Sequence, residues 1–181
     1  NAIGWLGTVA SAVVYAAPID TMIKIIQAGD VGDFSALPYV AALFTAAMWV
    51  FYTTPAVTPC LLQPLVTNVA GAAAELVYIL IYAWFCVRGA HRDKSLGLLT
   101  RVNVLWLTVL AGLLIDAIAV GVAFGAAANG GPSASTTLGI VAAVLTVCMY
   151  AAPTAIVPLV LRTRSVQYMP LYLTIALLVN S

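Results

Sequence analysis

The chain has 181 residues, of which 64% are hydrophobic and only 7% are charged, and its mean hydropathy is +1.08. Soluble domains carry about 25% charged residues, so this composition excludes a soluble globular domain and indicates an integral membrane protein. A net charge of +1 also argues against a nucleic-acid-binding surface. The three cysteines lack C-x-x-C spacing and there is a single histidine, so we expect neither a metal site nor a cofactor.

Apolar stretches divide the chain into helices that cross the bilayer. A crossing needs about 20 mainly apolar residues. Five long stretches and a shorter one follow in chain order: Ile3–Ile26, Leu37–Thr54, Leu61–Val87, Val102–Ala127, Thr136–Leu161 and Met169–Ser181. The last gives about 20 Å of helix, too short to cross. We therefore expect its remainder, and a seventh helix, beyond Ser181.

The basic residues predict the orientation of these helices. All seven flank the first, third and fifth connections, whereas the second and fourth, around residues 55–60 and 128–135, carry no charge. By the positive-inside rule the basic side is cytoplasmic and the N-terminus lies outside or in a lumen. Either the plasma membrane or an endomembrane fits this pattern. The seven are Lys24, Arg88, Arg92, Lys94, Arg101, Arg162 and Arg164.

An internal repeat predicts the architecture. The motif Tyr-Ala-Ala-Pro ends at Pro18 and recurs ending at Pro153, and a second proline opens each following helix, Pro38 and Pro170. Both copies run the same way under the charge assignment, so an odd number of helices must join them. We expect an all-α integral membrane fold of two parallel triple-helix repeats joined by an inverting linker helix. The units would span residues 1–87 (first repeat), 88–134 (cytoplasmic loop and linker helix) and 135–181 (second repeat, incomplete).

Parallel repeats of this kind are a transporter architecture, with the site near the bilayer midplane. Pro18 and Pro153 interrupt their helices because each lacks a backbone donor. A kink is a natural place for a helix to bend during gating. The alternative is a static kink that only shapes packing.

At these residues the sequence resembles the SWEET sugar-transporter family, which is of the MtN3/saliva type and similar to PQ-loop proteins. This resemblance implies a seven-helix bundle that moves mono- or disaccharides down their gradient by alternating access, without ion coupling. It also implies that Pro18, Pro38, Pro153 and Pro170 act as hinges near the cytoplasmic gate. The matching segments are residues 33–40 (DFSALPYV) with Trp49, residues 68–71 (NVAG) with Glu75 and Tyr78, residues 149–153 (MYAAP) and residues 163–170 (TRSVQYMP).

The resemblance further implies a substrate pocket formed by Ser11, Val14, Thr45, Trp49, Asn68, Thr146, Met149 and Asn180. The chemistry of these residues agrees, because a sugar needs hydroxyl and amide partners beside a flat aromatic face, and no charge. Two alternatives stay open. Serine and threonine often bond between membrane helices, and a tryptophan near a helix end often anchors at the interface. The bulk of Met149 favours a hexose over a disaccharide.

Three carboxylates lie inside or near the membrane, where ionisable groups are usually functional. Asp20 has Lys24 one turn onward, which predicts an ion pair. Glu75 lies seven residues after Asn68 on nearly the same helix face, and Asp116 has no evident partner. They keep open a proton-coupled transporter of another small solute, such as an amino acid. A seven-helix receptor is a further alternative, which the parallel repeat disfavours.

Small residues predict close helix contacts at two places. Gly71, followed by three alanines, permits close approach, and Gly121-x-x-x-Gly125 predicts a contact within the bundle or between subunits of a homo-oligomer. There is no G-x-S-x-G, G-x-G-x-x-G or P-loop motif, so we do not expect an enzyme.

Overall fold

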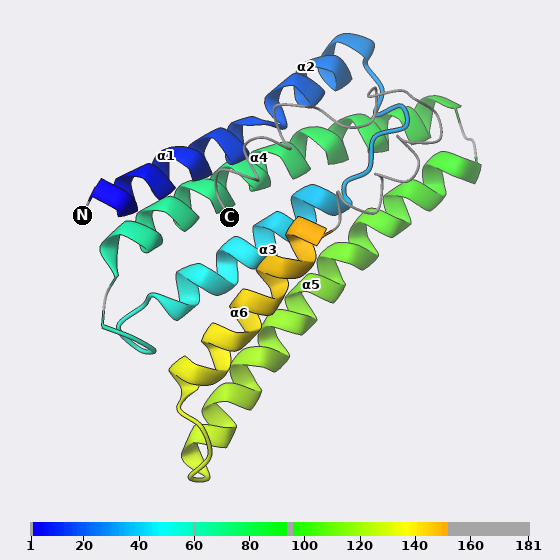
Figure 1. Cartoon of the computed structure of the whole chain (residues 1–181). Helices are drawn as coiled ribbons and strands as arrows, with labels where there is room; N and C mark the ends of the chain where they lie inside the picture. Colours follow the sequence, from blue (N-terminus) through cyan, green and yellow to red (C-terminus); the bar gives the residue numbers. More distant parts are fainter. Residues whose placement is uncertain (1, 60, 94–95, 152–181) are drawn as a thin grey trace.

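The computed structural model describes residues 2–59, 61–93 and 96–151 (Figure 1). Six helices make up most of this part of the chain. They are α1 (Ala2–Ala16), α2 (Ile19–Ala28), α3 (Leu37–Tyr52), α4 (Leu62–Asp93), α5 (Leu96–Ala128) and α6 (Ala134–Ala151). The predicted helix Met169–Ser181, with Pro153, Pro170 and Asn180, lies outside the described residues.

The two prolines of the first repeat have different effects on the helices. The stretch predicted as Ile3–Ile26 is divided into α1 and α2 by a turn at Ala17 and Pro18, so the predicted interruption is confirmed. Pro38 instead lies in the first turn of α3 and is exposed. A proline in the first turn of a helix costs no helical hydrogen bond, so Pro38 is accommodated at the start of α3, whereas Pro18, inside an apolar stretch, interrupts its helix.

The third and fourth predicted helices are longer than expected. α4 continues to Asp93 rather than Val87, and α5 begins at Leu96 rather than Val102. The prediction ended each helix where the basic residues begin. Backbone hydrogen bonding does not depend on the hydrocarbon boundary, so both helices extend into the polar interface beyond it.

Helix α4 organises the bundle (Figure 1). It lies between the broken helix α1/α2 and α3, and it also packs against α5, while α6 packs against α3 and α5. One buried core gathers residues of α2, α3, α4 and α5, including Ile25, Tyr39 and Cys86. A second core lies where α3, α5 and α6 meet, around Met48 and Leu138. The helices α2, α3 and α4 therefore share one core with α5, and α6 joins this group through α3 and α5.

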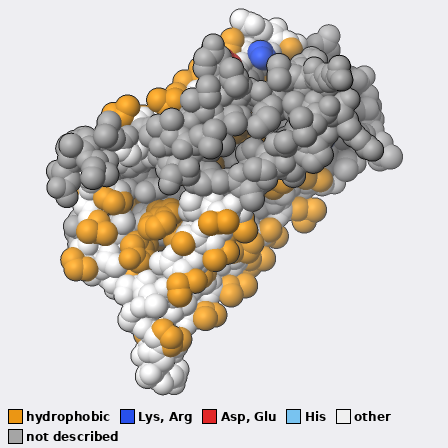
Figure 2. All heavy atoms as spheres, viewed as in Figure 1, with side chains coloured by type: hydrophobic (Ala, Val, Ile, Leu, Met, Phe, Trp, Pro, Cys, Tyr) orange, Lys and Arg blue, Asp and Glu red, His pale blue; other side chains and the backbone are white. Residues whose placement is uncertain are grey.

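The outer surface of the bundle is apolar. Side chains such as Leu107 and Ile118 on α5 are 64% and 62% exposed. Figure 2 shows hydrophobic side chains spread over the uncovered part of one face. Three helical stretches are long and apolar enough to cross a membrane, namely Gly7–Ala28, Leu62–Gly89 and Arg101–Ala128, and Leu37–Tyr52 and Ala134–Met149 are shorter apolar helices. Such a surface requires lipid, and the protein is an integral membrane protein.

Two glycines mark the closest helix contacts. A Cβ placed on Gly71 would overlap the ring of Tyr15, so the close approach predicted there is confirmed. The ring of Phe44 lies over Gly112 in the same way. Among the described residues nothing lies within 4 Å of a Cβ placed on Gly121 or Gly125, so no helix of this part of the chain makes a close contact there, and the contact between subunits stays a prediction.

The predicted ion pair between Asp20 and Lys24 is also not formed. Both side chains are exposed, and the ion pair recorded among the described residues joins Arg101 to Asp33 at 3.6 Å. An exposed pair gains little free energy over separate hydration, so one-turn spacing alone does not bring the two charges together. Arg101 also donates to the Gly32 carbonyl, which fastens the start of α5 to the loop after α2.

Candidate functional site

A pocket of about 100 Å³ lies where α1, α3, α4 and α6 meet. Its walls come from both the first repeat and the first helix of the second, and among the described residues no charged side chain lines it. Its lining consists of Ser11, Val14, Tyr15, Ala42, Thr45, Ala46, Trp49, Thr67, Asn68, Thr146 and Met149. Four helices thus contribute side chains to one pocket, and its described lining is uncharged.

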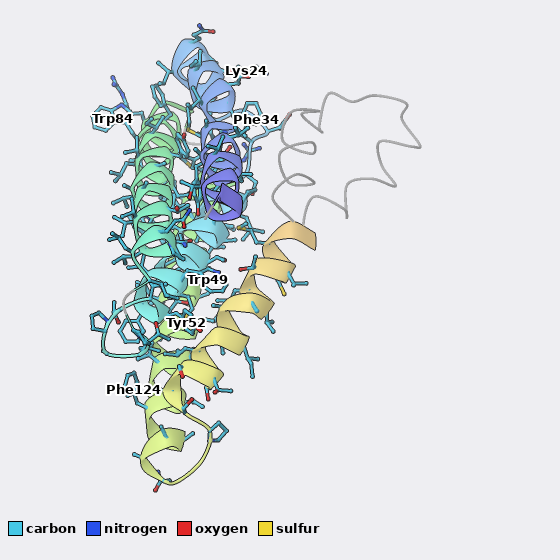
Figure 3. All side chains as sticks on the ribbon, turned by 60° about the vertical axis from the view of Figure 1, so that its left-hand side comes forward. Lys24, Phe34, Trp49, Tyr52, Trp84 and Phe124 are labelled. Carbon is cyan, nitrogen blue, oxygen red and sulfur yellow. The ribbon has the colours of Figure 1, made fainter. Side chains whose placement is uncertain are left out.

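Trp49 spans the boundary between α3 and α6. Its indole Nε1 donates to the hydroxyl of Thr146 at 2.9 Å, and Thr146 in turn donates to the Ala142 carbonyl at 2.8 Å. The Tyr52 ring packs edge-on against the indole, with ring centroids 5.5 Å apart; both residues are labelled on α3 in Figure 3. Trp49 therefore lies in the pocket with a fixed ring orientation, and not at a lipid-facing anchor position.

Asn68 is held by two hydrogen bonds. Its Nδ2 donates to the Pro64 carbonyl at 2.9 Å, and its Oδ1 accepts the Tyr15 hydroxyl at 3.4 Å. A carboxamide has two N–H donors and two acceptor lone pairs, so one donor and one lone pair are left for a bound molecule. The side chain is thus oriented before any ligand arrives.

The threonines differ in how their hydroxyls are used. Thr45 is buried and donates to the Ala41 carbonyl of its own helix at 2.8 Å. Thr67 bonds to the carbonyl of Gln63 at 2.9 Å and lies 3.4 Å from the hydroxyl of Thr8 on α1. Each hydroxyl that donates to a carbonyl keeps lone pairs that can accept from a ligand.

Seven of the eight predicted pocket residues lie together in this pocket, and Asn180 is outside the described residues. The sequence reasoning missed four lining residues, Tyr15, Ala42, Ala46 and Thr67. Tyr15 could have been found, because it lies one helical turn after Ser11 and so shares its face. Ala42 and Ala46 carry no polar group that would single them out.

The two remaining carboxylates lie outside the pocket lining. Glu75 is only 4% exposed and lies near Tyr39 and Tyr78 of the first core. One oxygen of each carboxyl, Glu75 Oε2 and Asp116 Oδ1, is buried and has no hydrogen-bond partner among the described residues. The described lining of the pocket is thus uncharged, and these two carboxyl groups lie elsewhere on α4 and α5.

The fold and pocket define a class: a helical membrane bundle with a proline-broken first helix and an uncharged polar pocket between its repeat units. A family model described as "Sugar efflux transporter for intercellular exchange" matches residues 1–90 and 136–181. The chain belongs to this family, the SWEET family. The two matched blocks leave out residues 91–135, which contain most of α5.

Individual proteins of the SWEET family are similar to nearly the whole chain. The chain is 36% identical over 180 residues to the bidirectional sugar transporter SWEET4 of Oryza sativa subsp. indica, which covers 99% of this chain and 65% of that protein. It is 33% identical over 180 residues to SWEET8 of Arabidopsis thaliana, covering 99% and 71%. The chain thus spans about two thirds of the length of such relatives.

The fold matches a solved structure. A eukaryotic SWEET transporter superposes with a TM-score of 0.72 at 24% sequence identity, covering 97% of this chain and 76% of that one. The all-α plan of triple-helix repeats joined by a linker helix is confirmed by this likeness.

Proposed function

We propose that the protein carries mono- or disaccharides across a membrane as a facilitative uniporter working by alternating access. The observation that carries this proposal is the neutral pocket in which a tryptophan face, an oriented carboxamide and several hydroxyls meet between the first repeat and α6. A sugar offers hydroxyls to such groups and an apolar face to the indole, and it needs no charge. The named relatives are bidirectional sugar transporters, which supports the same substrate class.

In this proposal Trp49 stacks on the sugar ring and Asn68 bonds its hydroxyls. Thr45 and Thr146 act as additional acceptors, since each already donates to a carbonyl of its own helix. Ser11, Val14 and Met149 complete the walls, with Asn180 as a further member that belongs to the last part of the chain. The units proposed at residues 1–87, 88–134 and 135–181 are supported by the two separate blocks that the family model matches.

The size of the pocket favours a hexose. Its volume of about 100 Å³ is below the roughly 300 Å³ at which small-molecule sites usually begin. The pocket must therefore widen to take any sugar, and a monosaccharide requires less widening than a disaccharide. The volume supports the same preference as the bulk of Met149.

Alternating access requires the bundle to bend, and we assign hinge roles to Pro18, Pro38, Pro153 and Pro170. Within the first repeat the larger role belongs to Pro18, which interrupts its helix, and the smaller to Pro38, which lies in the first turn of α3. The break between α1 and α2 supports a hinge at Pro18 most directly. We place the end of the bundle that carries Lys24 and Arg101 in the cytoplasm and the N-terminus outside. The ion pair of Arg101 with the loop after α2 supports this, because it puts two predicted cytoplasmic connections at one end.

Tracer uptake tests the proposal. Cells that lack their own sugar carriers, expressing the intact protein, should accumulate labelled glucose, and sucrose more weakly, until inside and outside concentrations are equal. The control is the same cells with the vector alone. No uptake of either sugar, with the protein detected at the membrane, would overturn the proposal.

A second candidate, proton-coupled transport of another small solute, is favoured by the unpartnered buried oxygens of Glu75 and Asp116. A carboxyl group inside a membrane bundle is a common part of proton relays. A protonophore separates the two candidates. A uniporter continues to equilibrate its sugar when the proton gradient collapses, whereas a coupled carrier loses accumulation above the outside concentration.

A further inference from the structure

The break at Pro18 receives a hydrogen bond from another helix. The last carbonyls of a helix have no partner in the next turn, and α1 ends at Ala16. The Ala17 N–H donates to the carbonyls of Val13 and Val14 at 3.1 and 3.2 Å. The following carbonyl, that of Tyr15, accepts the hydroxyl of Tyr78 on α4 at 2.8 Å. The Tyr78 side chain of the continuous helix α4 therefore hydrogen-bonds to the backbone at the end of α1, beside the break.

Tyr15 also reaches α4 through its own side chain. Its ring lies over Gly71, and its hydroxyl donates to Asn68 Oδ1 at 3.4 Å in the pocket. Helix α4 thus holds Tyr15 at two levels, through Asn68 and Tyr78, which are ten residues or about 15 Å apart along the helix. One residue of α1 joins the pocket to the break.

The position of Tyr78 is fixed by its surroundings. It is 8% exposed, so water cannot readily replace its hydroxyl. Its ring packs edge-on against that of Tyr39, with centroids 6.2 Å apart, and both tyrosines lie in the same buried core as Met22 and Ile25 of α2. Both sides of the break, the end of α1 and the body of α2, are therefore connected to this pair of tyrosines.

We infer that Tyr78 is a positioning residue of the transport cycle, whose hydroxyl couples the pocket side chains Tyr15 and Asn68 to the angle between α1 and α2. This inference rests on the proposed function. The Tyr15 carbonyl lies at the break and Tyr78 lies within a continuous helix. A change of angle at Pro18 in which the end of α1 moves relative to α4 therefore lengthens this hydrogen bond. A bond made in one conformation and weakened in the other biases the population of the two.

The test reads the two conformations directly through a thiol in the pocket. Ala42 lines the pocket from α3 and is outside the proposed set of substrate-binding residues. In a parent chain with its three native cysteines replaced, Ala42→Cys is labelled by a membrane-impermeant reagent, first from outside and then from inside in everted vesicles. The ratio of the two labelling rates follows the populations open to each side, and it does not depend on how much protein is present.

In the Tyr78→Phe variant this ratio should change by about two- to tenfold, the range expected for the loss of one hydrogen bond. The matched control is Tyr82→Phe. Tyr82 lies one turn further along α4, is 3% exposed and donates to the Phe34 carbonyl at 2.9 Å, outside the break. Its ratio should equal that of the parent. An unchanged ratio in Tyr78→Phe, or an equal change in both variants, would overturn the inference.

A second variant keeps the inference testable if Tyr78→Phe fails to reach the membrane. Pro18→Ala restores the missing N–H, so α1 and α2 can continue as one helix, and it should also shift the ratio by twofold or more. A parent-like ratio in Pro18→Ala would contradict the coupling. Sugar uptake by the parent is measured in the same cells. Absence of uptake counts against the proposed function, whereas an unchanged labelling ratio counts against this inference alone.

Discussion

Two helix interfaces of the bundle each pack an aromatic ring against a glycine, but they differ in the polar groups around that ring. At the α1–α4 interface the Tyr15 ring covers Gly71, and at the α3–α5 interface the Phe44 ring covers Gly112. In both places a glycine lets an aromatic ring lie directly on a neighbouring backbone. The rings are alike in size, and they differ by one hydroxyl.

The hydroxyl of Tyr15 belongs to a group of hydrogen bonds between α1 and α4 that has no counterpart among the described residues of the α3–α5 interface. The α1–α4 interface carries bonds from Tyr15 to Asn68, from Tyr78 to the Tyr15 carbonyl and from Gln63 to Thr8 at 3.1 Å. Among the described residues no hydrogen bond joins side chains of α3 and α5, and Asp116, one turn after Gly112, keeps an unpartnered oxygen. The first interface should therefore respond to changes of polar atoms, and the second to changes of volume.

The largest effect should come from Asn68→Ala at the α1–α4 interface. Sugar uptake per molecule at the membrane should fall at least about tenfold, because both the ligand contacts and the partner of Tyr15 are lost. Tracer uptake normalised to surface-labelled protein measures it. The control is Asn129→Ala, since the carboxamide of Asn129 also bonds a carbonyl four residues back, at 2.7 Å, but is exposed. Wild-type uptake by the Asn68 variant would remove this residue from the site.

The two glycines give a matched pair. Gly71→Ala and Gly112→Ala should each lower the free energy of unfolding by about 1–3 kcal/mol, because a ring must move aside. Only Gly71→Ala should raise the KM for sugar, by about three- to tenfold, since it displaces Tyr15 and with it Asn68. Thermal unfolding in detergent and uptake kinetics measure the two effects. Equal KM changes in both variants would mean that the interfaces do not differ in function.

The two prolines of the first repeat, Pro18 after α1 and Pro38 in the first turn of α3, should also differ in their effect on transport. Pro18→Ala should lower the maximal uptake rate by about threefold or more, because a continuous helix resists bending. Pro38→Ala should stay within about twofold of wild type, since an exposed first-turn proline breaks no hydrogen bond. Initial-rate kinetics at saturating sugar distinguish them. A larger loss in Pro38→Ala would reverse the assignment of the hinge.

The smallest effect is expected at the α3–α5 interface, from Asp116→Asn. This substitution keeps the shape of the side chain and removes its acidic group. Sugar uptake should remain within about 1.5-fold of wild type and stay insensitive to a protonophore. Sensitivity in the wild type that the variant abolishes would instead favour the proton-coupled candidate, and would give this interface a functional role.

The sequence was a good guide where one residue determines the local structure. Pro18 interrupts a helix and Pro38 begins one because each lacks an N–H, and neither effect requires a tertiary neighbour. Seven of the pocket residues that the family resemblance implied also line one pocket, and helical spacing is consistent with this, since it brings Ser11 and Val14, or Trp49 and Thr45, onto one face.

The sequence was a poor guide where a contact depends on a distant partner. The bond from Tyr78 to the Tyr15 carbonyl joins residues 63 positions apart, and nothing in the spacing of either residue predicts it. The pair Asp20 and Lys24 has helical spacing but is exposed, so the two charges stay separate. Gly121 and Gly125 have the spacing of a contact motif on a face that no described helix covers.

The indole of Trp49 gives this protein an optical reporter of its own. Its indole N–H donates to Thr146 and so joins α3 to α6 across the pocket, and its emission should change when this hydrogen bond breaks. Trp84 and Trp106 are 60% and 58% exposed on the outside of the bundle, where the ring of Trp84 also carries Arg88 5.3 Å above it. A chain that retains Trp49 alone would therefore signal the separation of α3 from α6 as a change in fluorescence, without any attached dye.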